Sequence, residues 1–74
     1  MEIARRISID ADVRFGKAVI TGTRIPVEIV LGKLAGGMTY QEIIEEYGIT
    51  LDDIHAVLSY AANSLSEEHL KAVG

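Results

Sequence analysis

The sequence predicts a mainly α-helical fold, in which a short β arm precedes three helices and the last two helices form a helix-turn-helix. Three observations support this fold class. A Gly-Thr-Arg-Ile-Pro-Val block at residues 22–27 separates a β-branched run from apolar residues at helical spacing. Two threonine start signals follow, at Thr39 and Thr50. The chain has 74 residues, which fits a single domain over residues 1–74.

The predicted β arm covers residues 1–24. Residues 7–10 alternate between apolar and polar side chains, and residues 18–21 form a β-branched run that Gly22 ends. Turn residues at 10–13 and 15–17 separate the two runs, so we expect a small hairpin. A two-stranded hairpin is marginal alone, so it must pack on the helices or on a partner. Residues 1–6 either fray or add a strand to something else.

The first and second helices are expected at residues 26–36 and 40–47. Pro26 suits the first helical position, and a glycine pair at 36–37 ends the first helix. The second helix begins with a Thr39-x-x-Glu42 capping box, in which threonine and glutamate each satisfy the other's backbone N–H group. Gly48 ends this helix.

The third helix is expected at residues 51–63 or longer, after a second capping pattern, Thr50-x-x-Asp53. Its end is open, because Ser64-x-x-Glu67 can cap a fourth helix or lie within a continuous one. A continuous helix would overhang the small domain and expose apolar side chains, as dimerising helices do. The candidate partner or dimer interface is therefore Leu58, Ala62, Leu65, Glu67, Glu68 and Leu70.

The composition favours a subunit that binds another protein chain. Hydrophobic residues make up 49% of the chain and the mean hydropathy is +0.24, more than one small core needs. We therefore expect a dimer or a hetero-complex. No apolar run approaches the roughly 18 residues of a membrane span, no cleavable signal is visible at residues 1–8, and cysteine is absent. These features predict a cytoplasmic protein that does not bind membranes.

The charges are divided unevenly along the chain. The formal net charge is −4. Residues 1–33 carry six basic and four acidic side chains, whereas residues 34–74 carry one basic and seven acidic side chains. Phosphate contacts are therefore expected from the N-terminal half, while the acidic C-terminal half suits a basic protein partner.

Enzymatic chemistry has little support in the sequence. His55 and His69 do not have a recognised metal-ligand spacing, and no nucleophile has a local signature. The acidic residues beside the threonine caps are explained by the helix dipole. We expect neither catalysis nor a metal or cofactor.

The helix-turn-helix has the shape of a DNA reader without its charges. In the DNA-binding version, exposed residues at the start of the last helix enter the major groove. Here these would be Asp52, Asp53, His55 and Ala56. Two of them are acidic, and no lysine or arginine occurs between residues 51 and 70, so a protein interface is favoured.

The basic residues of the arm offer a different route to a polyanion, because such arms can lie along a groove. Alternatively, they are solvated or paired with Asp10, Asp12 and Glu28. Arg24 lies between Gly22 and Pro26 in a turn that would fix its position. The candidate DNA or partner contacts are Arg5, Arg6, Arg14, Lys17, Arg24, Thr39, Gln41 and His55.

The residues over about 7–63 resemble the small prokaryotic family catalogued as "domain of unknown function 433". The resemblance rests on Ile-Ser-Ile-Asp at 7–10, Gly-Lys-Ala-Val-Ile-Thr-Gly-Thr-Arg-Ile-Pro-Val at 16–27, Leu-Ala-Gly-Gly-Met-Thr at 34–39, Ile-Ile-Glu-Glu-Tyr at 43–47 and Leu-Asp-Asp-Ile at 51–54. It implies a homeodomain-like three-helix domain and a VapB-like antitoxin. The implied partner is a PIN-like ribonuclease toxin, and the complex would co-regulate its own operon.

Two functions remain open from the sequence. In the first, the protein is an antitoxin-like binding module that neutralises a PIN-like toxin with its arm and its acidic last helix. In the second, it is a stand-alone homodimeric helix-turn-helix regulator that binds DNA.

Overall fold

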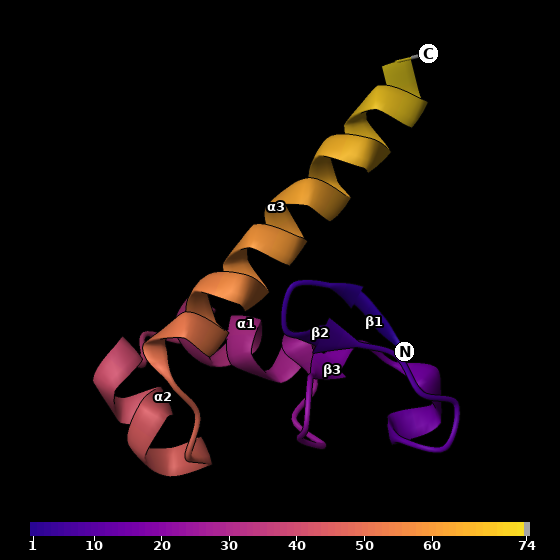
Figure 1. Ribbon diagram of the computed structural model, residues 1–74. Coiled ribbons are helices and arrows are strands. Elements are labelled where there is room, and N and C mark those ends of the chain that lie inside the picture. The colour runs from indigo at the N-terminus through magenta and orange to yellow at the C-terminus, as the bar shows by residue number, and fades with distance from the viewer. Residues whose placement is uncertain (74) are drawn as a thin grey trace.

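A small antiparallel sheet packs against three helices in the computed structural model, which describes the backbone of residues 1–73 and the side chains of residues 1–67 (Figure 1). The sheet has the order β1-β2-β3, and a single 3-10 turn, η1, lies between its last two strands. The elements are β1 (Glu2–Ala4), β2 (Ile7–Ser8), η1 (Arg14–Gly16), β3 (Val19–Ile20), α1 (Val27–Ala35), α2 (Tyr40–Tyr47) and α3 (Leu51–Val73).

The sheet has one strand more than the predicted hairpin. Residues 1–6 neither fray nor leave the domain, because β1 pairs with β2. Arg5 and Arg6 form the turn between these strands, and Arg6 takes the left-handed conformation, with φ of 64°. A three-residue strand is too short to show a period of two, which explains why the sequence pattern did not reveal it.

The sheet forms one wall of the hydrophobic core and does not project as an arm. Ile7 of β2 pairs with Ile20 of β3, and both side chains are fully buried. They join Val30 of α1, Ile43 of α2 and Ile54 of α3 in one cluster. A lone two-stranded hairpin is marginally stable, whereas three hydrogen-bonded strands whose apolar face packs on helices form a stable sheet.

The first helix begins one residue later than predicted. Pro26 has ψ of 142°, which is extended, and forms a β-bridge with Val19. The Val27 N–H donates to the Ala18 carbonyl at 3.0 Å. Pro26 is therefore the cap of α1 and not its first residue, because its backbone continues the sheet.

The second helix has the predicted caps at both ends. The Glu42 N–H donates to Thr39 Oγ1 at 3.1 Å, and the Thr39 N–H donates to Glu42 Oε1 at 2.9 Å. Gly48 ends the helix with φ of 66°. A side chain rarely adopts this left-handed conformation, so glycine is favoured at this position.

The third helix is continuous from Leu51 to Val73, so Ser64 and Glu67 do not begin a separate helix. Its first half packs on the sheet and α1, and its second half stands clear of the other elements (Figure 1). At 1.5 Å per residue, α3 is about 34 Å long. No helix in the described part of the chain is long and apolar enough to cross a membrane.

Candidate functional site

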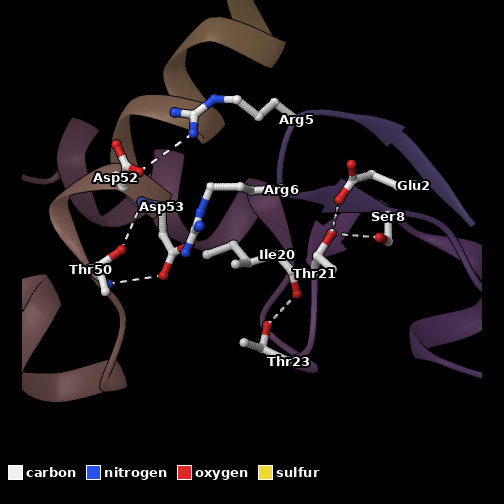
Figure 2. A network of polar contacts seen from close by, with 10 residues as sticks. All are labelled: Glu2, Arg5, Arg6, Ser8, Ile20, Thr21, Thr23, Thr50, Asp52 and Asp53. Carbon is white, nitrogen blue, oxygen red and sulfur yellow. Dashed lines mark hydrogen bonds and ion pairs between the residues drawn. The ribbon is translucent and has the colours of Figure 1, made fainter.

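Arg5 and Arg6, in the turn between β1 and β2 that is called the sheet tip below, contact the first turn of α3 (Figure 2). Arg6 Nε donates to Asp53 Oδ1 at 2.7 Å, and Arg6 Nη2 lies 2.6 Å from the same oxygen. Arg5 Nη1 lies 3.4 Å from Asp52 Oδ2. The Arg5 pair is exposed at both ends, whereas the Asp53 side chain is only 8% exposed. The ion pair between Arg6 and Asp53 therefore ties the sheet to the last helix.

Asp53 combines this ion pair with the cap of α3. The Thr50 N–H donates to Asp53 Oδ2 at 2.9 Å, and the Asp53 N–H donates to Thr50 Oγ1 at 3.1 Å. Burial raises the pKa of Asp53, but the Thr50 N–H, the Arg6 guanidinium and the Thr50 hydroxyl outweigh it, so the pKa lies below the ordinary 3.8. The carboxylate is thus stabilised in its charged form.

The lowered pKa of Asp53 predicts a loss of stability in acid. A carboxylate with a depressed folded pKa stabilises the native state above its unfolded pKa, near 4, and the contribution disappears as pH falls through the folded pKa. Urea unfolding at pH 7, 5, 4 and 3 should show the native protein losing stability below about pH 4. Asp53→Asn should be less stable than the native protein at pH 7, and this difference should shrink in acid. A constant difference across this range would contradict the assignment.

The start of α3 is less exposed than a DNA-reading helix requires. Of the four residues expected to be exposed there, Asp53 is 6% exposed and Ala56 is 4% exposed. Asp52 and His55 remain at the surface, with Arg5 paired to Asp52. The expectation was wrong for Asp53 and Ala56 because the sheet tip and the core cover that side of the helix.

The other basic candidates do not form one patch with Arg5 and Arg6. Lys17 Nζ lies 2.5 Å from Glu28 Oε1, so the predicted pairing with Glu28 is present. Arg14 lies in η1 and Arg24 lies in the turn before α1; both are exposed, and neither makes an ion pair among the described side chains. Arg24 is thus available to a partner and does not tie the turn to the domain.

The polar candidates on the helices have structural contacts. Thr39 caps α2, and Gln41 Nε2 donates to Glu45 Oε1 at 2.9 Å. The His55 ring meets Tyr40 edge-on, with ring centroids 6.3 Å apart. Arg5 and His55 together line a hollow of about 330 Å³ beside α3, so the structure brings these two candidates together.

The second half of α3 forms an overhang, defined here as residues 62–73. Ala62 and Leu65 are exposed, Leu65 to 66%, and Glu67 is exposed beside them. Leu58 lies before the overhang and was expected to be exposed, but it is half-buried against the core. Leu65 lies seven residues after Leu58 and continues the same helix face. The side chains of Glu68 and Leu70 lie outside the described residues.

The described residues form a small mixed α/β domain of three helices and a three-stranded antiparallel sheet. Among the described residues, no three metal-ligating side chains gather, and the charged groups serve caps and ion pairs. The observed features are a small mixed α/β domain, an exposed α3 overhang and a set of surface arginines.

The chain belongs to the family described as "Protein of unknown function (DUF433)", whose model matches residues 7–61. It is similar to the crystal structure of a DUF433 member protein from Anabaena variabilis, with 27% sequence identity and a TM-score of 0.77. That match covers 93% of this chain and 69% of the other chain. No curated protein matches the sequence.

Two surface aromatics escaped the sequence reasoning. Phe15 was read only as part of a turn, yet its side chain is 100% exposed. Tyr60 lies on α3 and lines two hollows. A sequence signal existed for Phe15, because it is the single phenylalanine and lies in a loop between Arg14 and Lys17.

Proposed function

We propose that the protein is an antitoxin-like binding module that neutralises a basic, PIN-like ribonuclease by covering it with the α3 overhang. One observation carries the proposal. The apolar face of α3 continues past the body of the domain, so that Leu65 is 66% exposed on the face that buries Ile54 and half-buries Leu58. An amphipathic helix of this kind can place its apolar face in a groove of a partner.

The charge of the overhang supports a basic partner. Glu67 is exposed next to Leu65, and the sequence places Glu68 directly after it. A ribonuclease attracts a polyanion, so the surface around its substrate site carries positive charge. Carboxylates flanking an apolar anchor complement such a surface and favour rapid association.

The use of Arg5 and Arg6 within the domain also favours a protein partner over nucleic acid. Both arginines contact carboxylates of α3, so they add little free positive charge to the surface. Asp52 is exposed at the start of α3 and would face phosphates if this helix entered a DNA groove. A protein-binding role avoids this repulsion.

The runner-up proposal is a homodimeric regulator with a homeodomain-like helix-turn-helix, in which α3 follows α2 after a short turn at residues 48–50. The exposed Arg14 and Arg24 support it. A gel-shift experiment with the operon's own promoter tests it, and binding without a partner at low salt is the required result. In the antitoxin proposal, DNA binding would need the toxin complex.

A charge inserted into the overhang should disrupt partner binding. Co-expression with the product of the adjacent gene should give a co-purifying complex that relieves toxicity. Leu65→Arg should weaken this complex by about 10- to 100-fold, because a buried interface leucine is replaced by a charge. Isothermal titration of the purified proteins measures the loss.

Ser66→Arg is the matched control for this experiment. It adds the same charge one residue further along the same helix, rotated by about 100° from the apolar face. Its affinity should stay within about threefold of the native value. Equal losses in both variants, or no complex with the native chain, would rule out the overhang as the binding surface.

A further inference from the structure

Phe15 is held away from the domain by an unusual backbone. Arg14, Phe15 and Gly16 have φ of 52°, 56° and 79°, three left-handed residues in a row. This conformation is uncommon for a bulky side chain and costs on the order of 1–3 kcal/mol. The ring is fully exposed, so the domain gains no burial in return. A strained and exposed aromatic at a loop tip is typical of an anchor for a binding partner.

An apolar hollow lies beside the loop that carries Phe15. Its volume is about 250 Å³, and it opens between the start of β3, α1 and α3. The ion pair of Lys17 and Glu28 lies at its rim. The residues that line it are Lys17, Ala18, Val27, Glu28, Leu31 and Tyr60.

We propose that two copies of this chain associate by placing Phe15 of each copy in the hollow of the other. Lys17 borders this hollow and also the surface around Phe15, so the projecting ring and the hollow adjoin. Because Phe15 is fully exposed, it leaves the hollow of its own chain to another side chain. A two-fold axis beside Lys17 brings both rings into both hollows at once, as a self-complementary interface requires.

The charges and the apolar lining suit this exchange. Exposed Arg14 precedes Phe15, and the exposed Glu28 carboxylate lies at the rim that an incoming Phe15 would pass. Glu28 already pairs with Lys17 of its own chain, so Arg14 of the other copy would join this ion pair as a second cation on the carboxylate. Tyr60 lines the hollow and offers an aromatic partner to the phenyl ring, a pairing that adds to simple burial.

The expected interface is small, and the dimer should therefore be weak. A buried phenylalanine removes about 150–250 Å² from solvent, so two rings contribute roughly 300–500 Å². Stable interfaces bury about 1,200–2,000 Å², and smaller ones are transient. This surface differs from the α3 overhang, so the dimer does not rest on the proposed function and leaves the overhang accessible.

Sedimentation across a concentration series tests the proposal. The native chain should pass from monomer to dimer between about 1 µM and 1 mM. Phe15→Asn should raise the dissociation constant at least tenfold while its circular dichroism and melting temperature stay at or above native values, since asparagine tolerates the left-handed conformation. Leu65→Asn is the matched control at another strongly exposed apolar side chain and should leave the dimer unchanged.

Photo-cross-linking identifies the contact directly. A benzoylphenylalanine at position 15 keeps an aromatic ring there, and a mixture of ¹⁴N and ¹⁵N chains separates cross-links between copies from those within one. Mixed-mass adducts at Leu31 or Tyr60 support the exchange. A native chain that stays monomeric at 1 mM, a dimer that Leu65→Asn disrupts and Phe15→Asn does not, or adducts confined to other surfaces would each overturn it.

Discussion

Replacing Asp53 with alanine should lower the free energy of unfolding by about 2–4 kcal/mol. The substitution leaves Arg6 without its partner and removes the carboxylate oxygen that accepts from the Thr50 N–H, whereas the backbone N–H of residue 53 still donates to Thr50 Oγ1. A domain of 74 residues has a total stability of roughly 4–11 kcal/mol, so this loss is a large share. Urea unfolding at pH 7 measures it.

Asp52→Ala is the control for Asp53→Ala. Asp52 adjoins Asp53 in the first turn of α3 and also pairs with an arginine of the sheet tip, but both partners are more than half exposed. Exposed pairs contribute about 0.2–1 kcal/mol. Asp53→Ala should therefore lower the free energy of unfolding clearly more than Asp52→Ala does. Similar losses would show that the Arg6 pair and the cap do not act together as described.

Ile7→Ala should lower the free energy of unfolding by about 2–5 kcal/mol, because it removes a fully buried side chain of the sheet. Ile7 is 0% exposed and packs in the same cluster as Val30, Ile43 and Ile54. The truncation would leave a cavity between the sheet and the helices and would remove packing contacts between them. The result would appear in chemical denaturation as a lower midpoint.

Ile3→Ala provides the comparison within the same sheet. Ile3 lies in β1 and is 40% exposed, so its truncation should cost less than about 1 kcal/mol. If Ile7→Ala were as mild as Ile3→Ala, the sheet would be an accessory arm, as the sequence alone had indicated, and not a wall of the core.

The helices could be predicted because their signals are local. The capping box of Thr39 and Glu42 acts across three residues, and Gly48 ends α2 as its position predicted. A capping box and a terminal glycine act on backbone groups only a few residues away, so they can be recognised without knowing the rest of the fold. Thr50 likewise marks the start of α3, because its side-chain oxygen accepts a hydrogen bond from the Asp53 N–H.

The sheet and the candidate site were harder to predict because they depend on distant partners. Arg6 and Asp53 are 47 residues apart, and nothing in the local sequence links a turn arginine with a helix-capping aspartate. The same distance explains why Asp53 was expected to be exposed. Phe15 is likewise fully exposed at the centre of three consecutive left-handed residues, a backbone conformation that no local sequence pattern indicates.

The 47-residue separation between Arg6 and Asp53 also has a consequence during synthesis on the ribosome. At about 5–20 residues per second, Arg6 is synthesised roughly 2–9 s before Asp53, its partner in the first turn of α3. Ile7 and Ile20, which are buried in the folded domain, therefore remain exposed to water until the helix residues that cover them have been synthesised. The nascent protein is open to chaperones and proteases until its last helix arrives, and mutations in that helix should act on cellular abundance as well as on binding.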